Sequence, residues 1–168
     1  NFDMVGPKNN WSDSVSYTTS DGVTFQYDPA HAGYSGYAIE KIGSRQGLYE
    51  TIFDTTYYNN NVTGNMIEAY DPDIVLLQIG TNDLLDSQNA GITDRLEKLV
   101  DKLLDSIDSN SMLFVASVPD IDVSVRHDWL WAYQSSGYSY ENNPEEFTAL
   151  VEQSVDNYNA SVKELVEK

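Results

Sequence analysis

The sequence contains no cysteine, which excludes disulfide bonds, thiolate nucleophiles and cysteine-ligated zinc. Basic residues are scarce: 9 Lys and Arg stand against 27 Asp and Glu, and the formal net charge is -18. The basic residues form no cluster, which argues against a nucleic-acid partner and against an anionic membrane surface. No apolar run approaches the length that a bilayer requires. A neutral partner such as a polysaccharide remains compatible with this charge.

The material for a hydrophobic core is present. The 168 residues are 40% hydrophobic and include 12 Tyr, 5 Phe and 3 Trp. This length and composition suit one domain with one core, so we take residues 1–168 as a single domain.

Two apolar runs enclose an amphipathic helix. Residues 74–79 and 112–118 are nearly continuous apolar runs, which is typical of strands buried on both faces. Helical spacing between them is shown by Leu96, Leu99, Val100, Leu103, Leu104 and Ile107. Strand, helix and strand predict a right-handed βαβ unit with parallel strands. A last helix is predicted after Asn143, a capping residue followed by Pro144. The predicted class is α/β, in three layers.

The remaining segments are shorter or more polar. Phe2–Val5 is apolar and ends at Gly6-Pro7, as a short strand does. Residues 8–30 predict a long surface loop with a small hairpin near residues 23–25. A short helix around Met66 and Tyr70 should end at Asp71-Pro72, because a residue before proline avoids the helical region.

Gly80-Thr81-Asn82-Asp83 follows the first buried run, at the sheet edge where α/β proteins bind ligands. A glycine there allows a sharp turn, an Asn side chain can donate N–H to a developing oxyanion, and Asp83 can brace the loop. The same four residues also suit an ordinary turn.

The second candidate segment is His31-Ala32-Gly33-Tyr34-Ser35-Gly36-Tyr37. Its glycines free the backbone to present N–H groups to an anion. It is not a Gly-x-Ser-x-Gly nucleophile elbow, because Tyr37 occupies the third glycine position.

Together, Gly33-Tyr34-Ser35-Gly36 and residues 72–83, PDIVLLQIGTND, resemble the second and third conserved blocks of SGNH, or GDSL-like, hydrolases. The phrases HAGYSGY and FDMVGPKN resemble the family-three carbohydrate esterases, secreted bacterial enzymes that deacetylate xylan. The resemblance covers roughly residues 2–120. It implies a flavodoxin-like parallel sheet, an extracellular location, an acetylated polysaccharide substrate and no metal or cofactor. It also implies that Gly36 and Asn82 donate to an oxyanion hole, supported by Gly80 and Asp83.

The chain departs from this family at two motifs. The Gly-Asp-Ser that carries the nucleophile is absent, as is a late Asp-x-x-His that carries the general base. His31 is expected to be structural, and His127 has the wrong spacing for the base. We therefore expect the first and last strands, the nucleophile and the base to come from another part of the same polypeptide or from a companion chain. Strand order 2-1-3-4-5 would make Phe2–Val5 strand two.

Two alternatives remain open at this point. A non-catalytic carbohydrate-binding or interaction domain would use aromatic platforms, for which the candidates are Tyr34, Tyr37, Trp129, Trp131 and Tyr133. A flavodoxin-like receiver or nucleotide-binding domain is a third interpretation, although the chain has no phosphate-binding loop.

Overall fold

A computed structural model describes residues 15–27, 32–54, 65–85, 90–130, 133 and 139–167. Parallel strands β3 (Ile74–Leu77) and β4 (Met112–Val115) form a two-stranded sheet in which Ile74 pairs with Met112 and Leu77 with Val115. Helix α4 (Ile92–Leu104) connects them. The predicted βαβ unit and the α/β class are confirmed. The expected strand Phe2–Val5 lies outside the described residues.

Helix α7 (Pro144–Val166) begins where the capping signal predicts. The Asn143 side chain accepts a hydrogen bond from the Glu146 N–H, which satisfies an N–H that the first helical turn leaves without a partner. Its buried residues recur at helical spacing; they are Phe147, Val151, Val155, Tyr158 and Val162. The last three pack with residues of α4 in the main core, whereas the first two join a second cluster with Val123, Leu130 and Tyr133. The helix thus contributes to both hydrophobic clusters.

Short helices complete the body. They are α1 (Leu48–Phe53), α2 (Met66–Tyr70), α3 (Thr81–Leu85), α5 (Val123–Arg126) and the 3-10 turn η1 (His127–Trp129). Helix α2 ends before Pro72, as predicted, and Asp71 adopts a left-handed conformation with φ 44°.

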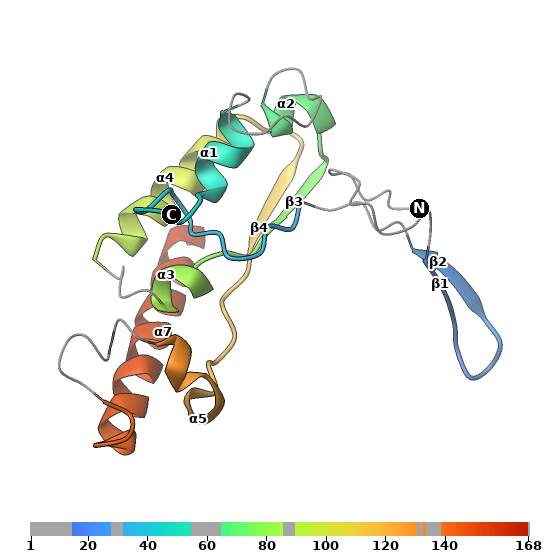
Figure 1. The fold of residues 1–168 in the computed structure, drawn as a ribbon. Coiled ribbons are helices and arrows are strands. Elements are labelled where there is room, and N and C mark those ends of the chain that lie inside the picture. The colour runs from blue at the N-terminus through green and yellow to red at the C-terminus, as the bar shows by residue number, and fades with distance from the viewer. Residues whose placement is uncertain are drawn as a thin grey trace.

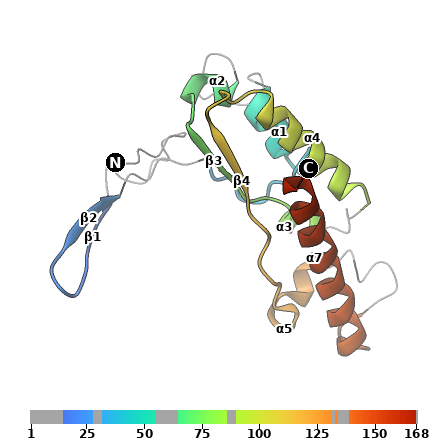
Figure 2. The same cartoon turned by 180° about the vertical axis from the view of Figure 1, so that it is seen from behind.

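The polar N-terminal segment contains the predicted hairpin. Its strands are β1 (Val15–Thr18) and β2 (Thr24–Tyr27), which pair antiparallel. Gly22, with φ 84°, lies in the turn between them. The hairpin lies apart from the helices in two opposite views (Figures 1 and 2).

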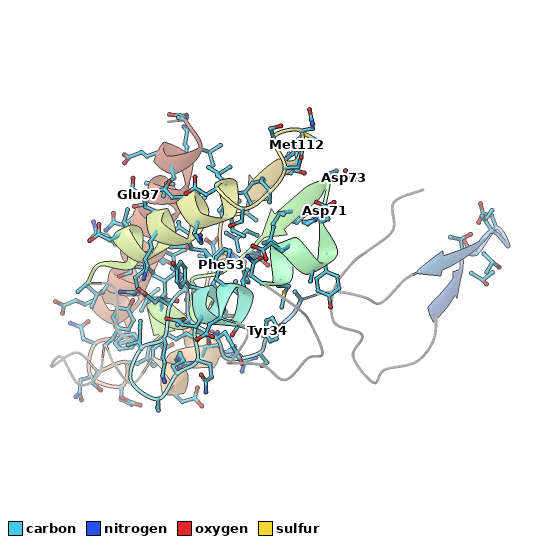
Figure 3. The ribbon with its side chains drawn as sticks, turned by 90° about the horizontal axis from the view of Figure 1, so that it is seen from above. Tyr34, Phe53, Asp71, Asp73, Glu97 and Met112 are labelled. Carbon is cyan, nitrogen blue, oxygen red and sulfur yellow. The ribbon has the colours of Figure 1, made fainter. Side chains whose placement is uncertain are left out.

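The helices α1, α4 and α7 lie on one side of β3 and β4 (Figures 1 and 3). Side chains on that side of the sheet, such as Leu77, join the main core with residues of α1, α2, α3, α4 and α7. The opposite side is open among the described residues, where Leu76 is 74% exposed and Phe114 is 51% exposed. The apolar runs predicted that both faces of these strands are buried, and this prediction is wrong for the described residues. An apolar run alone does not specify what covers each face of a strand.

Candidate active site

The Gly80–Asp83 segment lies at the carboxyl end of β3, as predicted. The strand ends at Leu77, and Thr81 begins α3. The segment that leaves β4 towards α5 lies at the same edge, because the two strands run parallel (Figure 1). This is the edge at which open α/β sheets bind ligands.

Gly80 is required by both conformation and space. Its φ is 114°, which side-chain-bearing residues rarely adopt, and a Cβ would lie 2.4 Å from Cζ of Tyr158. The Tyr158 hydroxyl donates a 2.7 Å hydrogen bond to the Ile79 carbonyl. Burial raises the pKa of this phenol, and the nearby Asp83 carboxylate acts in the same direction. Tyr158 is therefore a neutral hydrogen-bond donor beneath the turn.

The structure brings the two predicted oxyanion donors to the same place. Asn82 Nδ2 donates a 2.8 Å hydrogen bond to the carbonyl of Tyr37, the neighbour of Gly36. Gly36 has φ 81° and open space where a Cβ would be, so only its backbone conformation calls for glycine. Within the described part of the chain, the Gly36 N–H makes no hydrogen bond.

Arg45 links the same two residues, and sequence reasoning missed it. Its Nη1 atom donates to the Gly36 carbonyl at 2.9 Å and to Asn82 Oδ1 at 3.3 Å. A lone arginine in a polar loop carries no periodic signal, so the sequence offered no reason to single it out.

Asp83 joins the same segment to the core from below. Its side chain is fully buried; Oδ2 accepts from the Ile39 N–H and Oδ1 from Arg95 Nη2, both at 3.0 Å. Burial raises the pKa of the Asp83 carboxyl, because lost hydration outweighs the opposing effects of the Ile39 hydrogen bond and the Arg95 charge. Arg95, on α4, is a second contact that no sequence signal indicated.

Asn159 on α7 holds the segment that leaves β4. Its Oδ1 accepts from the Val118 N–H at 3.0 Å, and its Nδ2 donates to the Val118 carbonyl at 3.1 Å. Asn159-Ala160-Ser161 matches a glycosylation sequon, but the amide nitrogen that a glycan would modify is engaged in this pair.

Some of the aromatic residues predicted as stacking platforms for sugar rings are buried. Tyr37 and Tyr133 are 8% and 5% exposed, so they are core residues and not stacking platforms. Tyr34, half-buried, lies against Tyr37 with ring centroids 5.0 Å apart. Trp131 and the side chain of Trp129 lie outside the described structure.

Of the two histidines, His127 lies within the described residues and His31 does not. The His127 ring stacks on Tyr140, with centroids 4.4 Å apart, and its Nδ1 lies 3.3 Å from the Ser124 carbonyl. Asp28 and His31 do have Asp-x-x-His spacing, but they precede the Gly33–Gly36 block and lie outside the described residues. The family's general base follows that block, so this early pair does not match its position.

Across residues 15–27, 32–54, 65–85, 90–130, 133 and 139–167, no group of three or more His, Asp or Glu side chains could hold a metal ion. None of the described helices combines the length and apolarity of a membrane span.

Comparison with known proteins places these features in context. The model of the GDSL-like lipase/acylhydrolase family matches residues 6–168. A protein named multidomain esterase from Ruminococcus flavefaciens is 39% identical over 126 residues, which make up 72% of this chain and 15% of that relative. The chain thus spans a small part of the relative's length. No solved structure matches the chain significantly.

Proposed function

Because the chain belongs to the GDSL-like lipase/acylhydrolase family, we propose that it forms the oxyanion-binding part of a serine esterase that removes acetyl groups from a polysaccharide such as acetylated xylan. One observation carries this proposal: Asn82 donates to the carbonyl next to Gly36, so the two proposed oxyanion donors share one local hydrogen-bond network.

In the proposed reaction, a serine from outside these 168 residues attacks the acetyl carbonyl, and a histidine, also from outside, accepts the serine proton. The resulting oxyanion is held by the serine N–H, the Gly36 N–H and Asn82 Nδ2. The histidine then protonates the departing sugar oxygen, and water releases acetate from the acyl-enzyme. The serine and histidine segments belong to the same polypeptide or to a companion chain. No step needs a metal or cofactor.

The substrate proposal has two supports. The HAGYSGY segment resembles carbohydrate esterases, and the Ruminococcus relative is named a multidomain esterase. A net charge of -18 is compatible with a neutral glycan and would repel an anionic one. Since polysaccharide substrates lie outside the cell, we propose a secreted bacterial enzyme.

Asn82→Ala tests the oxyanion role in protein that includes the serine and histidine segments. Turnover should fall roughly 100- to 1000-fold with little change in KM, because the lost interaction forms chiefly in the transition state. Asn110→Ala is the matched control, since Asn110 is exposed in the turn before β4 and its amide nitrogen bonds to the neighbouring Asp108. A fall in kcat of less than about tenfold would remove Asn82 from this role.

Acetate release from acetylated xylan tests the substrate separately. Hydrolysis of an activated acetyl ester without any release from acetylated xylan would retain the esterase and reject the glycan. Failure to hydrolyse either substrate would reject the esterase proposal and favour a binding domain.

A further inference from the structure

We propose that Arg45 is a positioning residue of the oxyanion hole, which holds the Asn82 amide with its nitrogen available to the acyl oxygen. This inference rests on the proposed function and deepens it. Its basis is the pair of contacts that one guanidinium nitrogen makes, 2.9 Å to the Gly36 carbonyl and 3.3 Å to Asn82 Oδ1.

The backbone of Arg45 is fixed by local pairing. Ile42 and Arg45 exchange two backbone hydrogen bonds, of 3.2 Å and 2.9 Å, around a turn in which Gly43 has φ 58°. The next residue, Gln46, accepts a hydrogen bond from the Ala38 N–H. The turn that carries the guanidinium is thus paired with the segment that carries Gly36.

The orientation of the Asn82 amide follows from the chemistry of its two neighbours. Arginine can only donate hydrogen bonds, and the Tyr37 carbonyl can only accept them. The amide therefore satisfies both neighbours in one orientation, with Oδ1 towards Arg45 and Nδ2 towards Tyr37. The reversed orientation would oppose donor to donor and acceptor to acceptor.

This orientation bears directly on the proposed catalytic step. An amide nitrogen carries two hydrogens; one is committed to the Tyr37 carbonyl, which leaves the second for the oxyanion. A charged donor on the amide oxygen also polarises the group and strengthens its N–H as a donor. Arg45 reaches the proposed oxyanion site through Asn82 and the Gly36 carbonyl, so it is a positioning residue and not a catalytic one.

The test compares Arg45→Ala, Arg45→Lys and Asn82→Ala in the protein that includes the serine and histidine segments. Arg45→Ala should lower kcat about 10- to 100-fold, the effect of losing one charge-assisted hydrogen bond, and leave KM nearly unchanged. Arg45→Lys should recover part of this loss. Added guanidinium ion at non-denaturing concentration should raise the kcat of Arg45→Ala and not that of Asn82→Ala.

Lys41→Ala is the matched control, because it removes a positive charge from an exposed residue of the same loop and retains the Arg45 contacts. Its kcat should stay at the parent value. If it falls as far as Arg45→Ala, general electrostatics explains the effect and the inference is overturned. Should Arg45→Ala fail to fold, Arg45→Lys decides: a reduced kcat at unchanged KM and melting temperature supports the inference.

The outcomes separate the two proposals. Loss of activity in Asn82→Ala with unchanged kcat in both Arg45 variants overturns the role of Arg45 alone. Unchanged kcat in Asn82→Ala overturns the proposed oxyanion site itself. A fall in kcat for Arg45→Ala that comes with a matching rise in KM and no response to guanidinium identifies a merely structural residue.

Discussion

Replacing Arg95 by Met should destabilise the protein by about 3–5 kcal/mol, because it leaves a buried carboxylate without its charge partner. The Asp83 side chain is 0% exposed and that of Arg95 is 14% exposed, with 3.0 Å between Oδ1 and Nη2. Domains of this kind unfold with a free energy of roughly 5–15 kcal/mol. This one substitution should therefore remove a large share of the stability.

Asp83→Asn should also be costly, although it is nearly isosteric. Each carboxylate oxygen faces a donor, the Ile39 N–H on one side and Arg95 on the other. An amide has a single acceptor oxygen, so its NH2 group must oppose one of these donors, at a cost of about 1–3 kcal/mol. In the double variant Asp83→Asn/Arg95→Met, the amide oxygen is free to serve Ile39 and no charge remains buried. The double variant should therefore be more stable than Arg95→Met alone.

Urea denaturation of the four proteins in this cycle measures the coupling. We expect the double-variant effect to fall short of the sum of the single effects by about 2 kcal/mol or more, whereas independent sites add within about 0.5 kcal/mol. Asp101→Asn and Lys102→Met, at exposed positions of the same helix α4, form the control cycle and should be additive. Additivity in the Asp83 and Arg95 cycle, or a cost for Arg95→Met no larger than that of the control, would refute the reasoning.

The same pair has a pH signature with a definite sign. Burial raises the pKa of Asp83 above the ordinary aspartate value of 3.8, so the folded state keeps this proton to higher pH than the unfolded chain does. The contribution of Asp83 to stability is thus largest below pH 3.8 and falls as pH rises through the raised pKa. The stability difference between the parent and the double variant should follow this fall and level off at higher pH.

Two further predictions concern the turns at the ends of the strands. Gly80→Ala should lower the unfolding free energy by about 3–5 kcal/mol through backbone strain and a clash with Tyr158. Gly36→Ala should lower it by about 1–2 kcal/mol, because only the backbone conformation is strained there. Equal losses in urea denaturation would contradict the role of Tyr158. Asn159→Asp should cost about 1–3 kcal/mol at neutral pH by opposing a carboxylate to the Val118 carbonyl. That loss should diminish at acidic pH as the new carboxyl regains a proton to donate, and a pH-independent loss in thermal melts would count against the pairing.

Elements that depend on local sequence were predictable. The apolar spacing from Leu96 onward indicated α4, and Asn143 followed by Pro144 marked the start of α7. The structure starts α4 earlier, at Ile92, where Gly91 supplies no side-chain cap, so the usual signal for a helix start is absent. The position of Gly80 after a strand was likewise readable, because a glycine after an apolar run signals a turn.

Contacts between distant charged residues were not predictable. Arg45 is 37 residues from Asn82, and Arg95 is 12 residues from Asp83. Charged side chains in a loop or along a helix usually face solvent, so composition gives no reason to pair them with a buried partner. The open face of the sheet was missed for a related reason: Leu76 and Phe114 are as apolar as their buried neighbours, and only the arrangement of the helices distinguishes them.

Helix α7 fixes the candidate site through two successive residues. The Tyr158 hydroxyl holds the carbonyl of Ile79, at the exit from β3, and the Asn159 amide holds both backbone groups of Val118, at the exit from β4. Adjacent residues on a helix point about 100° apart, so a single turn of α7 reaches both strand exits. Because Tyr158 also fills the space that a side chain at position 80 would need, the helix constrains both the identity of Gly80 and the separation of the two exits. A helix that begins more than 60 residues later in the chain therefore constrains the geometry around Asn82. Substitutions in α7 should alter the site even when every residue that forms the site is unchanged.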